Sequence, residues 1–248
     1  MTNVLVIPGS MSFSQYGESG FATVKACAGG PQAILNQLGD HSTLNVVEVK
    51  YNDYDTIFGA SDGANKIATL LKELLLDSSE NVVVVGHSYG AVSSTLLIQN
   101  AQTLIPGIDP NRVKFINFAN SIRANTGLST MLGLGSLYGN PGPVTTKFQV
   151  IDVALEYDRW ADYPNNSGSQ YYWQAVNNVN SGDSVLGANI HNHYEAVRLD
   201  GTYGSGWTQR TIGSVKFMFF ETPSIPSAQG LTRSQLAQAY NRIVAPTW

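Results

Sequence analysis

The stretch Asn81-Val-Val-Val-Val-Gly-His-Ser-Tyr-Gly90 carries the strongest prediction of the fold. Its four consecutive valines show no alternation with polar residues, which is typical of a strand buried on both faces of a parallel sheet. The strand runs directly into Gly86-His-Ser-Tyr-Gly90, which matches G-x-S-x-G. In this motif a sharp strand-to-helix turn lifts the serine hydroxyl above the sheet, and the glycines let strand and helix pass closely. The alternative is a glycine-rich turn in which Ser88 only caps the following helix.

Strands and helices alternate along the chain on both sides of this stretch. Apolar runs predict strands at Val4–Ile7, Val46–Val49, Val113–Phe118, Phe148–Tyr157 and Val215–Phe220. Helical spacing of apolar residues predicts helices over residues 31–38, 64–76, 91–98, 171–180 and 235–244. The fold class expected from this order is α/β, with a mostly parallel central sheet of the α/β-hydrolase type and helices on both faces. A single domain spanning residues 1–248 is expected.

Composition excludes several classes of function. The net charge is −4, and no cluster of Lys or Arg is present, so we expect no nucleic-acid partner. Cys27 is the single cysteine, which rules out an intrachain disulfide. Met1–Gly9 lacks the pattern of a classical signal peptide, and no apolar run reaches the roughly 18 residues needed to cross a bilayer. We therefore expect a soluble chain with no integral membrane segment.

A serine hydroxyl becomes a strong nucleophile only beside a base, and the base needs an acid that orients it. In α/β hydrolases the three residues follow in the order serine, acid, histidine. After Ser88 only His191 and His193 remain, so the base is one of these two neighbours. The side chain of His87 is expected to point away along the turn, and His41 to be solvated in a polar loop.

The acid is expected at the carboxyl end of a strand that lies between the serine and the histidine. Asp158 follows the predicted strand Phe148–Tyr157 directly and is the preferred candidate. Asp162 is the alternative, and whichever carboxylate is not the acid is expected to hold the loop by hydrogen bonds to the backbone. Asp109 and Asp183 lie in turn sequences and are interpreted as turn formers.

Two backbone N–H groups would stabilise the oxyanion formed during acyl transfer. One comes from Tyr89, the residue after the nucleophile, and the other from Ser10 or Met11 in the loop after the first strand. An apolar acyl groove could be lined by Trp160, Met131, Leu132 and Leu134, with Phe13, Tyr16, Tyr163 and Trp173 as further candidates, although these side chains could equally form core. The glycine-rich segment 120–143 is a poor helix candidate and is expected to lie near this groove.

Three motifs together resemble a known family. Gly-His-Ser-Tyr-Gly, Glu156-Tyr-Asp-Arg-Trp-Ala-Asp-Tyr-Pro164 and His191-Asn-His-Tyr194 are similar to the motifs of the PE-PPE domain, a mycobacterial serine hydrolase domain related to cutinases. In that family the histidine that opens His-x-x-Tyr is catalytic, so the resemblance points to His191 rather than His193. It implies hydrolysis of acyl esters, such as lipid esters of the mycobacterial cell envelope, without metal or cofactor. The helical PE or PPE module that usually precedes the domain is absent from this sequence.

A free-standing domain of this family would suit a mycobacteriophage protein, either associated with virion tail proteins or released at the host cell envelope. Two other functions fit the same sequence. An acyltransferase would use the same triad to move a fatty acyl group onto a glycolipid, and a non-catalytic tail-binding module would keep only the fold.

Overall fold

The computed structural model describes residues 2–9, 44–53, 58–76, 80–124, 126–134, 142, 145–158, 160–180, 191, 194, 197, 207–220 and 231–240. Within these ranges the chain forms a sheet of seven strands in the order β2-β1-β3-β4-β5-β7-β6. The strands are β1 (Thr2–Ile7), β2 (Leu44–Glu48), β3 (Val82–His87), β4 (Val113–Phe118), β5 (Gln149–Leu155), β6 (Trp207–Ile212) and β7 (Val215–Phe220). Every neighbouring pair is parallel except β6 and β7. This arrangement confirms the predicted fold class.

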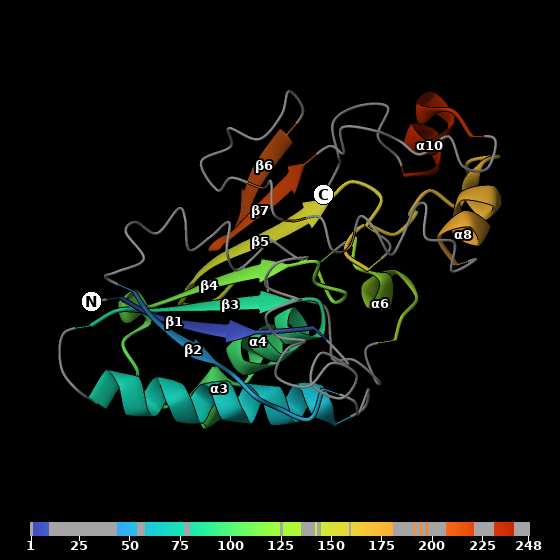
Figure 1. The fold of residues 1–248 in the computed structure, drawn as a ribbon. Helices are drawn as coiled ribbons and strands as arrows, with labels where there is room; N and C mark the ends of the chain where they lie inside the picture. Colours follow the sequence, from blue (N-terminus) through green and yellow to red (C-terminus); the bar gives the residue numbers. More distant parts are fainter. Residues whose placement is uncertain are drawn as a thin grey trace.

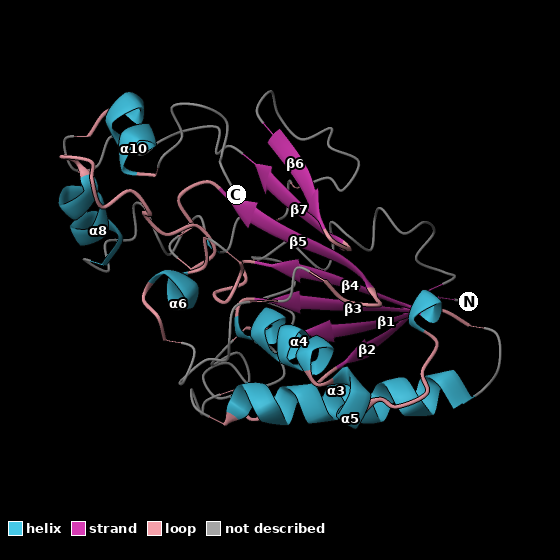
Figure 2. Cartoon of the chain, turned by 180° about the vertical axis from the view of Figure 1, so that it is seen from behind, coloured by secondary structure: helices cyan, strands magenta, loops and turns pink. Residues whose placement is uncertain are grey.

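The helices lie in two places relative to the sheet (Figures 1 and 2). The described helices are α3 (Gly59–Leu76), α4 (Tyr89–Gln99), α5 (Ala101–Leu104), the 3-10 turn η2 (Pro110–Arg112), α6 (Leu128–Met131), α8 (Tyr172–Asn180) and α10 (Arg233–Ala239). Helices α3 and α4 pack together against the sheet, whereas α6, α8 and α10 lie beyond the carboxyl ends of the strands. Of these three helices, α6 lies nearest to the ends of β3 and β4 in Figure 1.

Strand β3 is buried on both faces, as its run of valines predicts. Val82 and Val84 belong to an apolar cluster with α3 and α4. Val83 and Val85 belong to a second cluster, to which α8 and α10 contribute side chains. All four valines are at most 6% exposed, and complete burial of one such side chain contributes on the order of 1.5–3 kcal/mol. Strand β3, which precedes Ser88, is thus held by apolar packing on both of its faces.

Several element boundaries differ from the predictions. Helix α3 begins at Gly59 rather than at residue 64, and an added Cβ at Gly59 would lie 2.1 Å from the carbonyl oxygen of Asn52. Strand β5 ends at Leu155, shortly before Tyr157 with its positive φ of 65°. Helix α10 begins at Arg233, where Thr232 forms a capping box with Gln235.

The sequence analysis missed four of the described elements, namely α5, η2, α6 and β6. Strand β6 was not predicted; it joins β7 in an antiparallel hairpin whose turn contains Gly213 at a φ of 59°. The glycine-rich segment 120–143 contains the short helix α6. The helix predicted over residues 31–38 lies outside the described residues. No helix in the described part of the chain has both the length and the apolar character that crossing a membrane requires.

Candidate active site

The turn after β3 has the backbone geometry of a nucleophile elbow. Ser88 has a φ of 55° and a ψ of −120°, a region that non-glycine residues rarely occupy. An added Cβ at Gly90 would lie 2.3 Å from the carbonyl oxygen of Ile7, and one at Gly86 would lie 2.7 Å from that of Gly90. The Ser88 side chain makes no hydrogen bond to the start of α4. The interpretation of Ser88 as a simple helix cap is therefore wrong.

Three side chains meet at the carboxyl edge of the sheet. Nε2 of His191 lies 2.8 Å from Oγ of Ser88, and its Nδ1 lies 2.9 Å from Oδ1 of Asp158. Asp158 is fully buried, the His191 side chain is 12% exposed, and Ser88 is half-buried. If the Nδ1 proton is donated to the carboxylate, Nε2 is free to accept a hydrogen bond from the Ser88 hydroxyl. The structure thus brings together the serine, the preferred acid and one of the two candidate bases.

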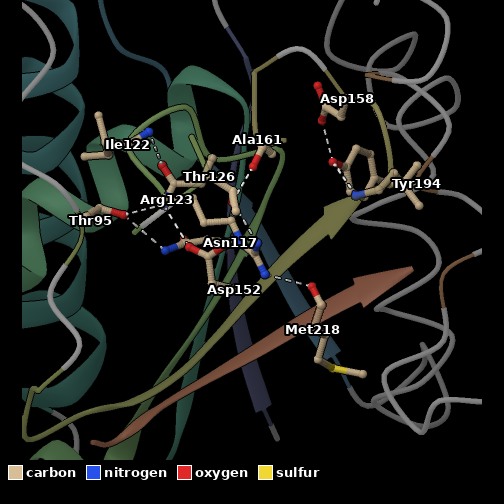
Figure 3. Close-up of polar contacts among 12 residues, drawn as sticks. Thr95, Asn117, Ile122, Arg123, Thr126, Asp152, Asp158, Ala161, Tyr194 and Met218 are labelled. Carbon is tan, nitrogen blue, oxygen red and sulfur yellow. Dashed lines mark hydrogen bonds and ion pairs between the residues drawn. The ribbon is translucent and has the colours of Figure 1, made fainter. Parts of the chain in front are cut away.

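The Asp158 carboxylate is surrounded by hydrogen-bond donors. Besides His191, the backbone N–H of Trp160 donates to Oδ1 at 3.0 Å. The Tyr194 hydroxyl donates to Oδ2 at 2.5 Å (Figure 3). Burial alone would raise the pKa of this carboxyl group, but attraction to His191 and these three hydrogen bonds outweigh burial and lower the pKa. Asp158 is therefore ionised at neutral pH, which is the state that orients a histidine base.

The carboxylate of Asp162, the alternative acid, makes a hydrogen bond to the backbone of its own loop. Its Oδ2 accepts a hydrogen bond from the backbone N–H of Tyr157 at 2.6 Å, where the chain turns with a positive φ. Asp162 thus holds the loop that carries Asp158, which is the role expected for the carboxylate that is not the acid.

The prediction for His87 was wrong, because its ring lies beside that of His191. Its Nε2 donates to the backbone carbonyl of His191 at 2.9 Å, and the centroids of the two imidazole rings are 5.0 Å apart. His87 is 3% exposed. Burial, followed by the nearby His191, lowers the pKa of His87 from its ordinary value to about 4. No local sequence pattern gives the orientation of this side chain, since its partner is distant along the chain.

Most of the sequence matches the model of a known protein family. The family model of the PE-PPE domain matches residues 31–232, a range that contains Ser88, Asp158 and His191. The chain belongs to the PE-PPE domain family. No curated protein matches this PE-PPE domain.

The solved structures that match this PE-PPE domain share little sequence with it. A cutinase-like protein from Cryptococcus sp. is 16% identical, with a TM-score of 0.45, and the match covers 71% of this chain and 90% of that chain. A protein assigned as a cell surface hydrolase from Lactobacillus plantarum is 13% identical, with a TM-score of 0.46 and coverage of 96% and 88%. Acetyl xylan esterase from Aspergillus awamori is 12% identical, with a TM-score of 0.36 and coverage of 97% and 89%.

Gly9 lies close to Ser88. An added Cβ at Gly9 would lie 3.0 Å from Cβ and 3.5 Å from Oγ of Ser88, so a side chain at this position would crowd Ser88. Tyr89, the predicted oxyanion donor that follows Ser88, is the first residue of α4, where the backbone N–H groups have no partner within the helix. Ser10 and Met11, the other predicted oxyanion donors, lie outside the described residues, as does the alternative base His193.

The predicted acyl-groove residues divide into packed and exposed ones. Trp160 and Met131 are partly buried against the cluster of Leu128, Tyr163 and Val176, and the Trp160 ring centroid is 6.0 Å from that of His191. Leu134 is partly buried and Leu132 is 47% exposed. Of the further candidates, Tyr163 is buried core and Trp173 is 69% exposed, while Phe13 and Tyr16 lie outside the described residues. The ring of Trp160 thus lies beside that of His191.

Sequence reasoning also missed a buried polar network that contacts the loop after β5, which carries Asp158. Arg123, which is fully buried, donates from Nε to Oδ1 of Asp152 at 2.8 Å and from Nη1 to Oγ1 of Thr126 at 2.9 Å. Thr126 in turn donates to the carbonyl of Ala161 at 2.7 Å. Within the described ranges, no three His, Cys, Asp or Glu side chains gather into a possible metal site.

Proposed function

We propose that this PE-PPE domain is a serine esterase that hydrolyses carboxylic esters of lipids through an acyl-enzyme intermediate. The observation that carries the proposal is the continuous line of hydrogen bonds from Ser88 through His191 to Asp158. The accessible, half-buried Ser88 is what an enzyme needs and a tail-binding module does not.

In the proposed mechanism His191 moves one proton in each half of the reaction. Its Nε2 removes the Ser88 proton as Oγ attacks the ester carbonyl carbon, and the tetrahedral oxyanion is stabilised by the N–H of Tyr89 and of the loop after Gly9. His191 then returns the proton to the departing alcohol, leaving an acyl-serine. Water attacks this ester with its proton passing to His191, and the carboxylic acid leaves as Ser88 regains the proton.

The composition around the site supports an apolar, uncharged substrate. The segments 124–146 and 163–182, which include α6 and α8, contain no Asp, Glu, Lys or Arg. Both helices lie beyond the carboxyl ends of the strands (Figure 1). Helices without charge at this edge of the sheet do not repel an acyl chain and offer no partner to an anionic group. Lipid esters such as those of a mycobacterial envelope are the substrates proposed, with a mycobacteriophage as the proposed source.

Hydrolysis of p-nitrophenyl esters of increasing chain length by the wild type and by Ser88→Ala tests the nucleophile. We expect turnover by the wild type and a loss of about 10⁶-fold in kcat for the variant, the size found when a triad serine is removed. Thermal unfolding of both proteins controls for folding. Comparable rates in the two proteins would refute the assignment of Ser88.

Product analysis separates the proposal from its alternatives. A lipid ester is incubated with and without a glycolipid acceptor: an esterase releases free fatty acid in both mixtures, whereas an acyltransferase forms an acylated glycolipid at the expense of the acid. Absence of both products, together with failure of a fluorophosphonate to label Ser88, would favour the non-catalytic binding module.

A further inference from the structure

The residue before the nucleophile forms a bridge that the triad itself does not require. His87 ends β3 and reaches across the site to the backbone carbonyl of His191, 104 positions along the chain, at 2.9 Å. The Nδ1 atom of the same ring is buried and has no hydrogen-bond partner among the described residues. Among the described residues the ring therefore bonds through Nε2, and the acceptor is the backbone carbonyl of His191.

The segment that carries the base is held at two of its described positions by side chains. Tyr194 is anchored through its hydroxyl, which donates to Asp158 and accepts from the backbone N–H of Leu155 at 3.2 Å. That contact ties the segment to the acid. The contact from His87 ties it to β3, the strand that precedes Ser88, so that a single side chain links the strand before the nucleophile to the backbone of the base.

We propose that His87 is a positioning residue, which holds the main chain of His191 so that Nε2 of the base stays within hydrogen-bond distance of Ser88. The inference rests on the proposed function, because it assigns His191 as the base. A neutral ring suits this role, since a cation 5.0 Å from His191 would oppose the imidazolium formed during acyl transfer. Burial of His87 holds its pKa at about 4 and so keeps the ring neutral at physiological pH.

Two amide substitutions separate the hydrogen bond from the polarity of the side chain. The amide nitrogen of glutamine occupies roughly the place of Nε2 of histidine, whereas that of asparagine corresponds to Nδ1 and falls short of the His191 carbonyl. In p-nitrophenyl ester hydrolysis we expect His87→Asn to lower kcat by roughly 10-fold with little change in KM, the loss expected for one misplaced hydrogen bond. His87→Gln is expected to stay within about 3-fold of the wild type, by the same reasoning.

A spectroscopic readout makes the test independent of turnover. The proton shared by Nδ1 of His191 and Asp158 gives a far-downfield NMR resonance, which we expect to persist in His87→Gln and to broaden by solvent exchange in His87→Asn. If His87→Asn does not fold, His87→Phe, which keeps a ring but has no donor, takes its place. Equal kcat values and equal resonances in the two variants, whether unchanged or reduced, would overturn the proposal. Failure of the proposed function would instead appear as absence of Ser88-dependent turnover in the wild type.

Discussion

At the scale of single residues, Asp158 and Asp162 show how neighbouring carboxylates take different roles. Both are buried and both lie in the loop after β5. Asp158 meets the imidazole of His191 and the hydroxyl of Tyr194, while Asp162 meets the backbone N–H of Tyr157. The difference depends on which way each side chain turns from the same loop, so it has a direct test.

We expect Asp158→Asn to lower kcat by about 10⁴-fold, because an amide facing Nδ1 of His191 favours the wrong tautomer of the base. Asp162→Asn is the matched control. Its amide oxygen can still accept from Tyr157, so kcat should remain within a few-fold of the wild type. Steady-state kinetics on one ester measure both. A larger loss in Asp162→Asn than in Asp158→Asn would reverse the assignment of the acid.

Tyr194→Phe removes a hydroxyl that makes two hydrogen bonds. The Asp158 carboxylate loses one of its donors, and the backbone N–H of Leu155 loses the hydroxyl as its acceptor. We expect the free energy of unfolding to fall by about 2–3 kcal/mol, since one of the lost bonds is to a charged group. Urea unfolding at pH 7 measures the change, and an unaltered midpoint would show that the hydroxyl contributes nothing to stability.

At the scale of elements, one buried arginine joins β5 and β7 to the loop that carries Asp158 (Figure 3). Arg123 contacts Asp152 on β5, and its Nη2 donates to the carbonyl of Met218 on β7 at 3.1 Å. Through Thr126 it reaches Ala161, and two backbone hydrogen bonds of 2.8 Å join the same two segments. The loop that presents Asp158 is thus supported from the sheet beneath it.

Arg123→Met leaves Asp152 buried without its cation, although Asn120 still donates to Oδ2 of that carboxylate. We expect the free energy of unfolding to fall by about 3–5 kcal/mol, the usual cost of removing one partner of a buried ion pair. The double variant Arg123→Met with Asp152→Leu should recover a large part of this loss, because no uncompensated charge remains. Urea unfolding of the single and double variants measures both effects. If the double variant is the least stable, the network stabilises by more than charge pairing.

At the scale of the whole molecule, the parallel sheet brings distant parts of the chain to one edge. Ser88 follows β3 and Asp158 follows β5, with β4 between them in the sheet. Two apolar clusters, one on each face, anchor these strands. The free energy of unfolding depends on the protonation of His87, because the folded protein buries this ring and disfavours its protonated form.

The pKa of His87 is lowered on folding from about 6.5 to about 4. Between these values the unfolded chain binds the proton and the folded protein does not, so stability falls as pH decreases through this window and the contribution levels off below pH 4. From pH 7 to pH 5 this group should remove about 2 kcal/mol from the free energy of unfolding. Urea unfolding at both pH values measures the slope. His87→Gln should lose this part of the slope, and an identical pH dependence in wild type and variant would contradict the prediction.

The sequence alone determined the features that depend on residues close together in the chain. The run Val82–Val85, buried on both faces, and the glycines around Ser88 specify a parallel strand and a tight turn, since both follow from local apolar periodicity and steric room. The alternation of strands and helices specified the fold class. Asp158 could be preferred as acid because it follows a predicted strand.

Only the tertiary structure decided the contacts made across space. The orientation of His87, the pairing of Arg123 with Asp152 and the antiparallel addition of β6 each depend on groups that the fold brings together. No local periodicity encodes such contacts, because a buried polar side chain turns toward whichever partner the packed core offers. The strand order decides which loops meet at the edge of the sheet. Packing around the strands decides which side chains are in contact.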